Sequence, residues 1–265
     1  MKRIISSLFF TLFIFSCNKV PISNRKQFNL LPESELMSMS LTSYKDFLGK
    51  HQVIQSTNSD AQLIKNVGFK ISKAVELYFK QQNQSNWLQG YNWEFNLVND
   101  NTVNAWCMPG GKVVFYTGII PVTKNETGIA VVMGHEIAHA IARHGNERMS
   151  QQLLVQAGGV ALSAALSQKS KETNDLFLSS YGIGSSLGIL KYSRMHESEA
   201  DKLGLVFMAL AGYNPTEAVS FWQRMSQQSG GVKPPQILST HPSDDTRIND
   251  IKQFLPTALR YYQSK

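Results

Sequence analysis

The sequence predicts a mainly helical α+β protein in which a small β-sheet lies beside a helix that carries two histidines. Three observations support this prediction. Apolar residues recur at helical intervals along much of the chain. Residues 91–118 instead contain short runs of β-forming residues separated by turn residues. The two histidines follow this region directly, within an apolar helical pattern.

Composition limits the class of protein. The chain has 265 residues, of which 42% are hydrophobic and 17% are charged, so disorder is not expected. No apolar run reaches the roughly 20 residues that a membrane-spanning helix needs. The net charge is +7, but the basic residues are scattered, which does not indicate nucleic-acid binding.

The N-terminus has the pattern of a secretory signal. Lys2 and Arg3 precede an apolar stretch at residues 8–15, and Ser16 with Cys17 resembles a bacterial lipobox, although Phe15 fits that motif poorly. We expect a signal peptide at residues 1–16 and one domain at residues 17–265 with a lipidated Cys17. The alternative is an ordinary signal peptide that is cleaved elsewhere. Cys107 then lacks an intramolecular partner, so we expect no disulfide.

The secondary structure can be placed in order along the chain. Helical patterns cover residues 32–48 and 60–82. Three strands are expected at residues 91–98, 103–106 and 112–118, with turns at 99–101 and 109–111. Residues 123–126 have the spacing of a capping box and begin a long helix that contains the histidines. Further helices are expected at about residues 196–211, from Pro215 onward, and at about 244–255.

The histidine motif at residues 135–139 predicts a zinc site. On a helix, His135 and His139 lie on one face and can bind one metal ion, because they are four residues apart. Glu136 is turned about 100° from His135 and can act as a base toward water at the metal. Apolar neighbours indicate that this part of the helix is buried, where polar side chains need partners.

A catalytic zinc needs a third protein ligand, and Glu197 and Glu199 are both candidates. Helical spacing favours Glu197, because Asp201 lies on the same helix face. One of the two could then bind the metal while the other hydrogen-bonds to a ligand histidine. His144 is five residues from His139 and would point off the metal-binding face of a continuous helix, so we interpret it as structural.

Six segments resemble the gluzincin metallopeptidases of the HtpX and CAAX prenyl endopeptidase family, particularly their soluble bacterial lipoprotein and periplasmic members. They are residues 104–111, 135–139, 143–150, 197–201, 212–215, and 241–242 with Arg247. The resemblance implies a gluzincin fold that binds one Zn²⁺ per chain through His135, His139 and Glu197. It also implies that Glu136 is the catalytic base and that Asp201 supports a ligand.

The resemblance further implies that the loop of His241 approaches the zinc. His241 could stabilise the oxyanion of the tetrahedral intermediate, or it could occupy the open coordination position and keep the enzyme latent. A third interpretation is that His241 only caps its loop. Arg247 is expected to position this loop or the substrate.

The strand after Gly110 and Gly111 is expected to form an edge beside the active site. An extended peptide could add to its main chain as another strand, so we interpret Gly110, Gly111, Lys112, Val113 and Val114 as substrate-binding residues. The alternative is an ordinary strand whose edge is covered.

These expectations lead to a zinc metalloendopeptidase that cleaves misfolded or misassembled proteins of the bacterial envelope. The expected partners are extended or unfolded polypeptides and, through the lipid, a membrane facing the periplasm. Two other functions remain open. One is a chaperone-like assembly factor with a largely latent zinc site, and the other is a metal-binding structural lipoprotein without turnover.

Overall fold

The computed structural model describes residues 18–157, 171–183, 193–228, 236–241 and 245–263. The expected signal peptide at 1–16 and the expected lipidation site Cys17 lie outside these residues, so both stay predictions. No helix in the described part of the chain combines the length and the apolar character that a membrane span requires.

The expected fold class, mainly helical α+β with one small sheet, is confirmed. The short strands β1 (Asn18–Lys19) and β2 (Lys26–Gln27) form a separate N-terminal hairpin. The larger helices are α1 (Glu33–Lys50), α2 (Ser59–Gln81), α4 (Glu126–Ile141), α5 (His144–Ala157), α7 (Lys171–Ser180), α8 (Arg194–Leu210), α9 (Glu217–Gln228) and α11 (Asp245–Ala258). Short helical elements are η1 (Ser85–Leu88), η2 (Thr117–Ile119), α3 (Ile120–Thr123), α10 (Gln236–Thr240) and η3 (Leu259–Tyr261).

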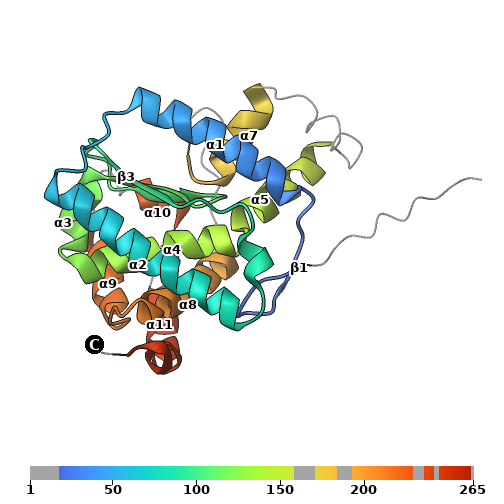
Figure 1. Ribbon diagram of the computed structural model, residues 1–265. Helices are drawn as coiled ribbons and strands as arrows, with labels where there is room; N and C mark the ends of the chain where they lie inside the picture. Colours follow the sequence, from blue (N-terminus) through green and yellow to red (C-terminus); the bar gives the residue numbers. More distant parts are fainter. Residues whose placement is uncertain (1–17, 158–170, 184–192, 229–235, 242–244, 264–265) are drawn as a thin grey trace, which may run out of the picture.

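The sheet is buried on both faces. Helix α1 lies on one side of it, and α2 and α4 lie on the other (Figure 1). Because successive side chains of a strand point to opposite faces, Val113 and Phe115 join the core with α2, α4 and α8. Val114 and Tyr116 join a second core with α1, α5 and α7. The sheet therefore separates two apolar cores.

The sheet has the strand order β3-β5-β4, formed by β3 (Glu94–Val98), β4 (Ala105–Met108) and β5 (Lys112–Tyr116). β5 pairs with β3 in parallel and with β4 in antiparallel orientation. Gly110 and Gly111, with φ of 79° and 80°, form the turn between β4 and β5.

The expectation that the strand after Gly111 is a free edge is wrong. Lys112, Val113 and Val114 lie in the central strand, where both sides already pair with a neighbour. The edge strand that contacts α4 is β4. After the hairpin turn, β5 runs back between β4 and β3 and pairs with both. The pairing with β3 is a long-range contact that the local sequence does not reveal.

Helices α4 and α8 pack with their backbones in direct proximity. A Cβ atom placed on Gly134 would lie 2.8 Å from the carbonyl oxygen of Gly204, and one placed on Gly204 would lie 2.9 Å from the amide nitrogen of His135. Only glycine fits at both positions. This contact sets the position of the first turn of α8 relative to the histidine motif of α4.

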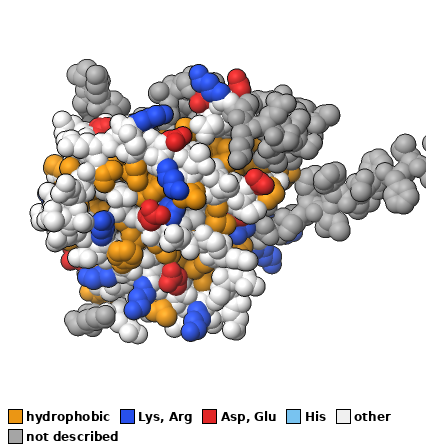
Figure 2. All heavy atoms as spheres, turned by 45° about the horizontal axis from the view of Figure 1, so that its top comes forward, with side chains coloured by type: hydrophobic (Ala, Val, Ile, Leu, Met, Phe, Trp, Pro, Cys, Tyr) orange, Lys and Arg blue, Asp and Glu red, His pale blue; other side chains and the backbone are white. Residues whose placement is uncertain are grey.

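Acidic and basic side chains are interspersed on the face of the molecule drawn in Figure 2, with apolar atoms between them. This distribution matches the scattered charge of the sequence. No large patch of one charge sign is seen on that face among the described residues.

Candidate metal centre

Helix α4 supplies two of the expected ligands. The Asn125 side chain accepts a hydrogen bond from the Gly128 amide at 2.9 Å and caps the N-terminus of this helix. His135 and His139 are both buried, and their Nε2 atoms lie 3.1 Å apart. The predicted pairing on one helix face therefore occurs.

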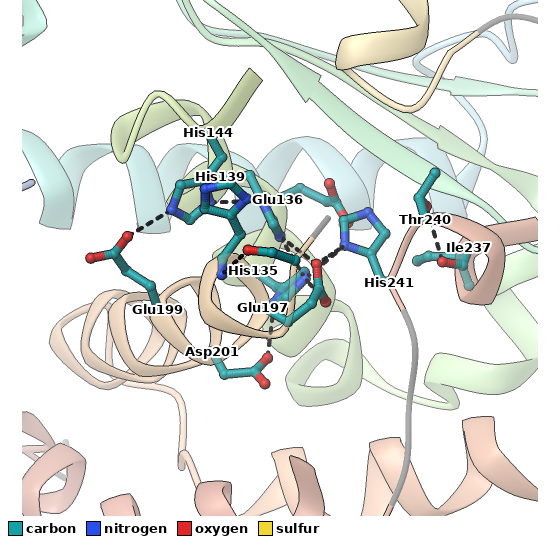
Figure 3. Close-up of polar contacts among 12 residues, drawn as sticks. His135, Glu136, His139, His144, Glu197, Glu199, Asp201, Ile237, Thr240 and His241 are labelled. Atoms are coloured by element: carbon teal, nitrogen blue, oxygen red, sulfur yellow. Dashed lines mark hydrogen bonds and ion pairs between the residues drawn. The ribbon is translucent and has the colours of Figure 1, made fainter. Parts of the chain in front are cut away.

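Two further side chains converge on this pair (Figure 3). Glu197, in the first turn of α8, has Oε2 3.5 Å from His135 Nε2 and Oε1 3.4 Å from His139 Nε2. His241, directly after α10, has Nδ1 3.2 Å from His135 Nε2 and 3.0 Å from Glu197 Oε1. One ligand atom from each of the four residues lies within 4.8 Å of the others.

This donor set fits zinc. Imidazole nitrogens and a carboxylate oxygen are common zinc ligands, and a catalytic site usually has three of them. Burial would raise the pKa of Glu197, but His241 and Arg247 outweigh it and hold this pKa well below its usual value. Burial lowers the pKa of His139 well below its usual value, which keeps its imidazole neutral as a ligand must be.

His135 differs from His139 in its protonation. Burial would lower its pKa, but hydrogen bonds with Asp201 and Glu197 raise the pKa of His135 to about 9. Metal binding at His135 must therefore release a proton near neutral pH.

Glu136 lies beside the four converging side chains. Its Oε1 is 3.7 Å from Nε2 of His241 and, among the described residues, makes no hydrogen bond although it is buried. Burial raises the pKa of Glu136 above its usual value. A carboxylate with a raised pKa is suited to taking up and returning a proton.

Asp201 and Arg247 lie behind the ligands. Asp201 Oδ1 is 2.9 Å from Nδ1 of His135, on the ring edge opposite the nitrogen that faces Glu197. Arg247, on α11, donates to Asp201 at 2.7 Å and lies 2.9 Å from Glu197 Oε2. Its guanidinium also stacks on Trp222 at 3.4 Å. Arg247 thus contacts the ligand set itself as well as the carbonyl oxygen of His241.

The other expected site residues lie elsewhere. Lys112 pairs with Glu94 at 2.6 Å, and Val113 and Val114 are fully buried in the two cores. Their main chain pairs with β3 on one side and β4 on the other, so it offers no free edge to an extended peptide. Gly110 and Gly111 form the turn described above.

Sequence reasoning missed the position of His144. It assumed one continuous helix, but α4 ends at Ile141, and Arg143 adopts a left-handed φ of 55° before α5 begins. This break returns the imidazole of His144 to His139, with the two Nδ1 atoms 2.9 Å apart. Burial lowers the pKa of His144 to about 4, so the ring is neutral.

Glu199, the alternative third ligand, faces away from the four converging side chains. Its Oε2 lies 2.9 Å from Nε2 of His144 and receives a hydrogen bond from Arg25. His196 and Glu199 are both buried. No local pattern marks Arg25, because it lies 174 residues away from Glu199 in the sequence.

Comparison with known proteins places this site in a family. Residues 70–255 match peptidase family M48. The mitochondrial metalloendopeptidase OMA1 of Saccharomyces cerevisiae is 32% identical over 258 residues, which cover 93% of this chain and 71% of that protein. OMA1 of Schizosaccharomyces pombe is 31% identical over 242 residues, or 90% of this chain and 66% of that protein.

The similarity to a bacterial relative covers a smaller part of both chains. The beta-barrel assembly-enhancing protease of Yersinia pestis is 34% identical over 162 residues, which are 60% of this chain and 33% of that protein. The similarity therefore extends further along both chains in the mitochondrial relatives.

The expected location in a bacterial envelope, lipid-anchored and facing the periplasm, is wrong. Similar proteins from two yeasts, Arabidopsis thaliana and Bos taurus carry names that place them in mitochondria. The expectation depended on a short lipobox-like pattern at the N-terminus. Similarity to the mitochondrial proteins extends over up to nearly the whole chain and outweighs that short pattern.

The relatives named above are neither HtpX nor CAAX prenyl endopeptidases, so the resemblance holds for the broader family. The expected enzyme class, a metallopeptidase, and its cofactor, zinc, are confirmed by the family match. On the match over residues 70–255, the chain belongs to peptidase family M48.

Proposed function

We propose that this chain is a zinc-dependent endopeptidase in which His135, His139 and Glu197 hold the zinc and Glu136 is the catalytic base. The observation that carries the proposal is the convergence of buried ligand atoms within 4.8 Å, with the Glu136 carboxylate beside them. When bound, zinc polarises the scissile carbonyl and lowers the pKa of water.

The side chains of the site then divide the remaining work. Glu136 takes a proton from the attacking water and returns it to the leaving amine, for which its raised pKa is suited. Asp201 accepts a hydrogen bond from Nδ1 of His135 and so keeps Nε2 of that ring toward the metal. Arg247 keeps both Glu197 and Asp201 in place.

We assign the substrate to the edge strand β4 (Ala105–Met108) in place of the strand first expected. β4 pairs with β5 on one side and contacts the histidine helix α4. An extended peptide that adds to β4 as another strand would lie beside the metal centre and hydrogen-bond to its main chain. This mode of binding favours unfolded or extended polypeptides.

The proposed biological role is quality control of misfolded or misassembled proteins. Support comes from the name of the Yersinia pestis relative, an assembly-enhancing protease. The alternative is a chaperone-like assembly factor with a largely latent zinc site. The position of His241 favours latency, because its Nδ1 lies within hydrogen-bond distance of both His135 and Glu197, where a fourth ligand would sit.

Removal of zinc tests the proposed function. The purified protein is expected to contain one zinc ion per chain and to cleave an unfolded polypeptide such as reduced casein. Treatment with a chelator should remove both zinc and cleavage, and stoichiometric Zn²⁺ should restore both. Zinc content is measured by atomic absorption and cleavage by release of labelled peptides. Full cleavage by the zinc-free protein would exclude the proposed chemistry.

His241→Ala tests latency. If His241 occupies the fourth position, the variant should cleave casein several-fold faster, roughly by the inverse of the fraction of chains in which that position is open. The measurement is kcat/KM at equal zinc content. His51→Ala is the control, since His51 stacks on Phe47 away from this site. A lower kcat at unchanged zinc affinity would instead assign His241 to oxyanion stabilisation.

A further inference from the structure

The two histidines of α4 are supported from behind in different ways. Nδ1 of His135 faces the Asp201 carboxylate directly, at 2.9 Å. Nδ1 of His139 faces Nδ1 of His144 at 2.9 Å, and Nε2 of His144 faces Glu199 Oε2 at 2.9 Å. On the Nδ1 side of His139, the Glu199 carboxylate is therefore reached through a second imidazole, that of His144 (Figure 3).

This chain of contacts is consistent with one arrangement of protons. If Nε2 of His139 binds a metal, its proton must sit on Nδ1. That proton is donated to Nδ1 of His144, which must then carry its own proton on Nε2. Nε2 of His144 in turn donates to the Glu199 carboxylate. Each step matches a donor with an acceptor, so the position of Glu199 fixes the orientation of both rings.

Glu199 is held by the N-terminal hairpin. Nε of Arg25 donates to Glu199 Oε2 at 2.9 Å, and the Ser23 hydroxyl donates to Glu199 Oε1. Nη2 of Arg25 also lies 2.8 Å from Glu199 Oε2 and 2.7 Å from Glu147 Oε2. One guanidinium thus bridges two carboxylates whose side chains are only 5% and 6% exposed.

Gln27 fixes the same hairpin to the metal-binding helix. Its Nε2 donates to Glu147 Oε2 at 3.1 Å and to the carbonyl oxygen of Ala142, just after α4. The hairpin lies outside residues 70–255, so the family match assigns it no role. Its side chains Ser23, Arg25 and Gln27 nevertheless reach Glu199 or Glu147 in the network behind His139.

We propose that Arg25 is a positioning residue of the metal centre, which acts on His139 through Glu199 and His144. The inference rests on the proposed zinc site. The planar guanidinium matches two carboxylates at once, which a lysine ammonium does not. Without it, Glu147 would keep Nε2 of His196 at 3.0 Å, but Glu199 would lose its guanidinium partner. A buried carboxylate without that cation would move away from its position against His144.

The test compares full-length wild type with Arg25→Gln, Arg25→Lys and His144→Phe. Zinc affinity is measured by competition with a chromophoric chelator, and kcat and KM are measured separately on casein. Removing an outer partner of a zinc ligand typically lowers metal affinity about 10- to 100-fold. We expect Arg25→Gln and His144→Phe to lose about tenfold in zinc affinity and to lower kcat, with KM unchanged because β4 is intact.

Lys26→Gln is the matched control, because it removes a neighbouring exposed positive charge from the same hairpin. Lys26→Gln should keep the zinc affinity of the wild type. Arg25→Lys should have a zinc affinity and a kcat between those of wild type and Arg25→Gln. It takes the place of Arg25→Gln in the comparison if that variant does not fold. A lower melting temperature with unchanged zinc affinity and kcat in both Arg25 variants would overturn the inference. Absence of zinc binding by the wild type would instead overturn the proposed function on which it rests.

Discussion

Glu136→Gln is expected to lower kcat for peptide cleavage by about 10²- to 10⁴-fold, the contribution typical of a general acid or base. Gln has the size of Glu but cannot take a proton from water. Zinc content should remain at that of the wild type, because Glu136 does not belong to the four side chains whose ligand atoms converge. Both quantities are measured on the same preparation, with labelled casein as substrate.

The control for this variant is Glu35→Gln, which makes the same chemical change on the exposed surface of α1. It should leave kcat unchanged. Binding of unfolded casein to Glu136→Gln should persist, since the edge strand β4 is unaltered. Undiminished cleavage by pure Glu136→Gln would assign the base to another residue.

Glu197→Ala is expected to lower zinc affinity by more than the roughly 10- to 100-fold that follows loss of an outer partner. The carboxylate of Glu197 faces both α4 histidines, at 3.5 Å and 3.4 Å. Arg247 contacts the carboxylates of both Glu197 and Asp201, so in this variant it keeps the contact with Asp201 and loses the one with Glu197. Zinc per chain after dialysis and affinity by chelator competition both report the loss.

Glu199→Ala is the matched comparison on the same helix, two residues away. It removes a carboxylate of equal size that contacts His144 instead of the converging ligands. Its effect on zinc affinity should therefore be smaller than that of Glu197→Ala. Full zinc stoichiometry and affinity in Glu197→Ala would show that the third ligand is a different residue, with His241, whose ligand atom also converges, the first to test.

Sequence periodicity was sufficient to place most elements. The helix expected at residues 60–82 is α2 (Ser59–Gln81), and the one expected at 196–211 is α8 (Arg194–Leu210). The histidine spacing placed two side chains on one face because i and i+4 positions are neighbours on any helix. Glu197 and Asp201 followed the same rule and lie on the side of α8 that faces α4.

Long-range contacts could not be read from local patterns. β5 is central because β3, which lies before β4 in the chain, pairs with its far side. His144 contacts His139 because one residue, Arg143, adopts a left-handed conformation that its side chain type does not indicate. Arg25 reaches Glu199 only through the completed fold.

The glycine contact between α4 and α8 has a thermodynamic consequence for metal uptake. Backbones that touch at Gly134 and Gly204 leave no flexible side chain between the two helices at that crossing, so rotamer changes cannot alter their separation there. The backbone positions of Glu197 and the two histidines are then set relative to one another before any ion arrives, and Arg247 holds the Glu197 side chain at 2.9 Å. Little conformational entropy remains to be lost on binding, and preorganisation of this kind favours tight metal association.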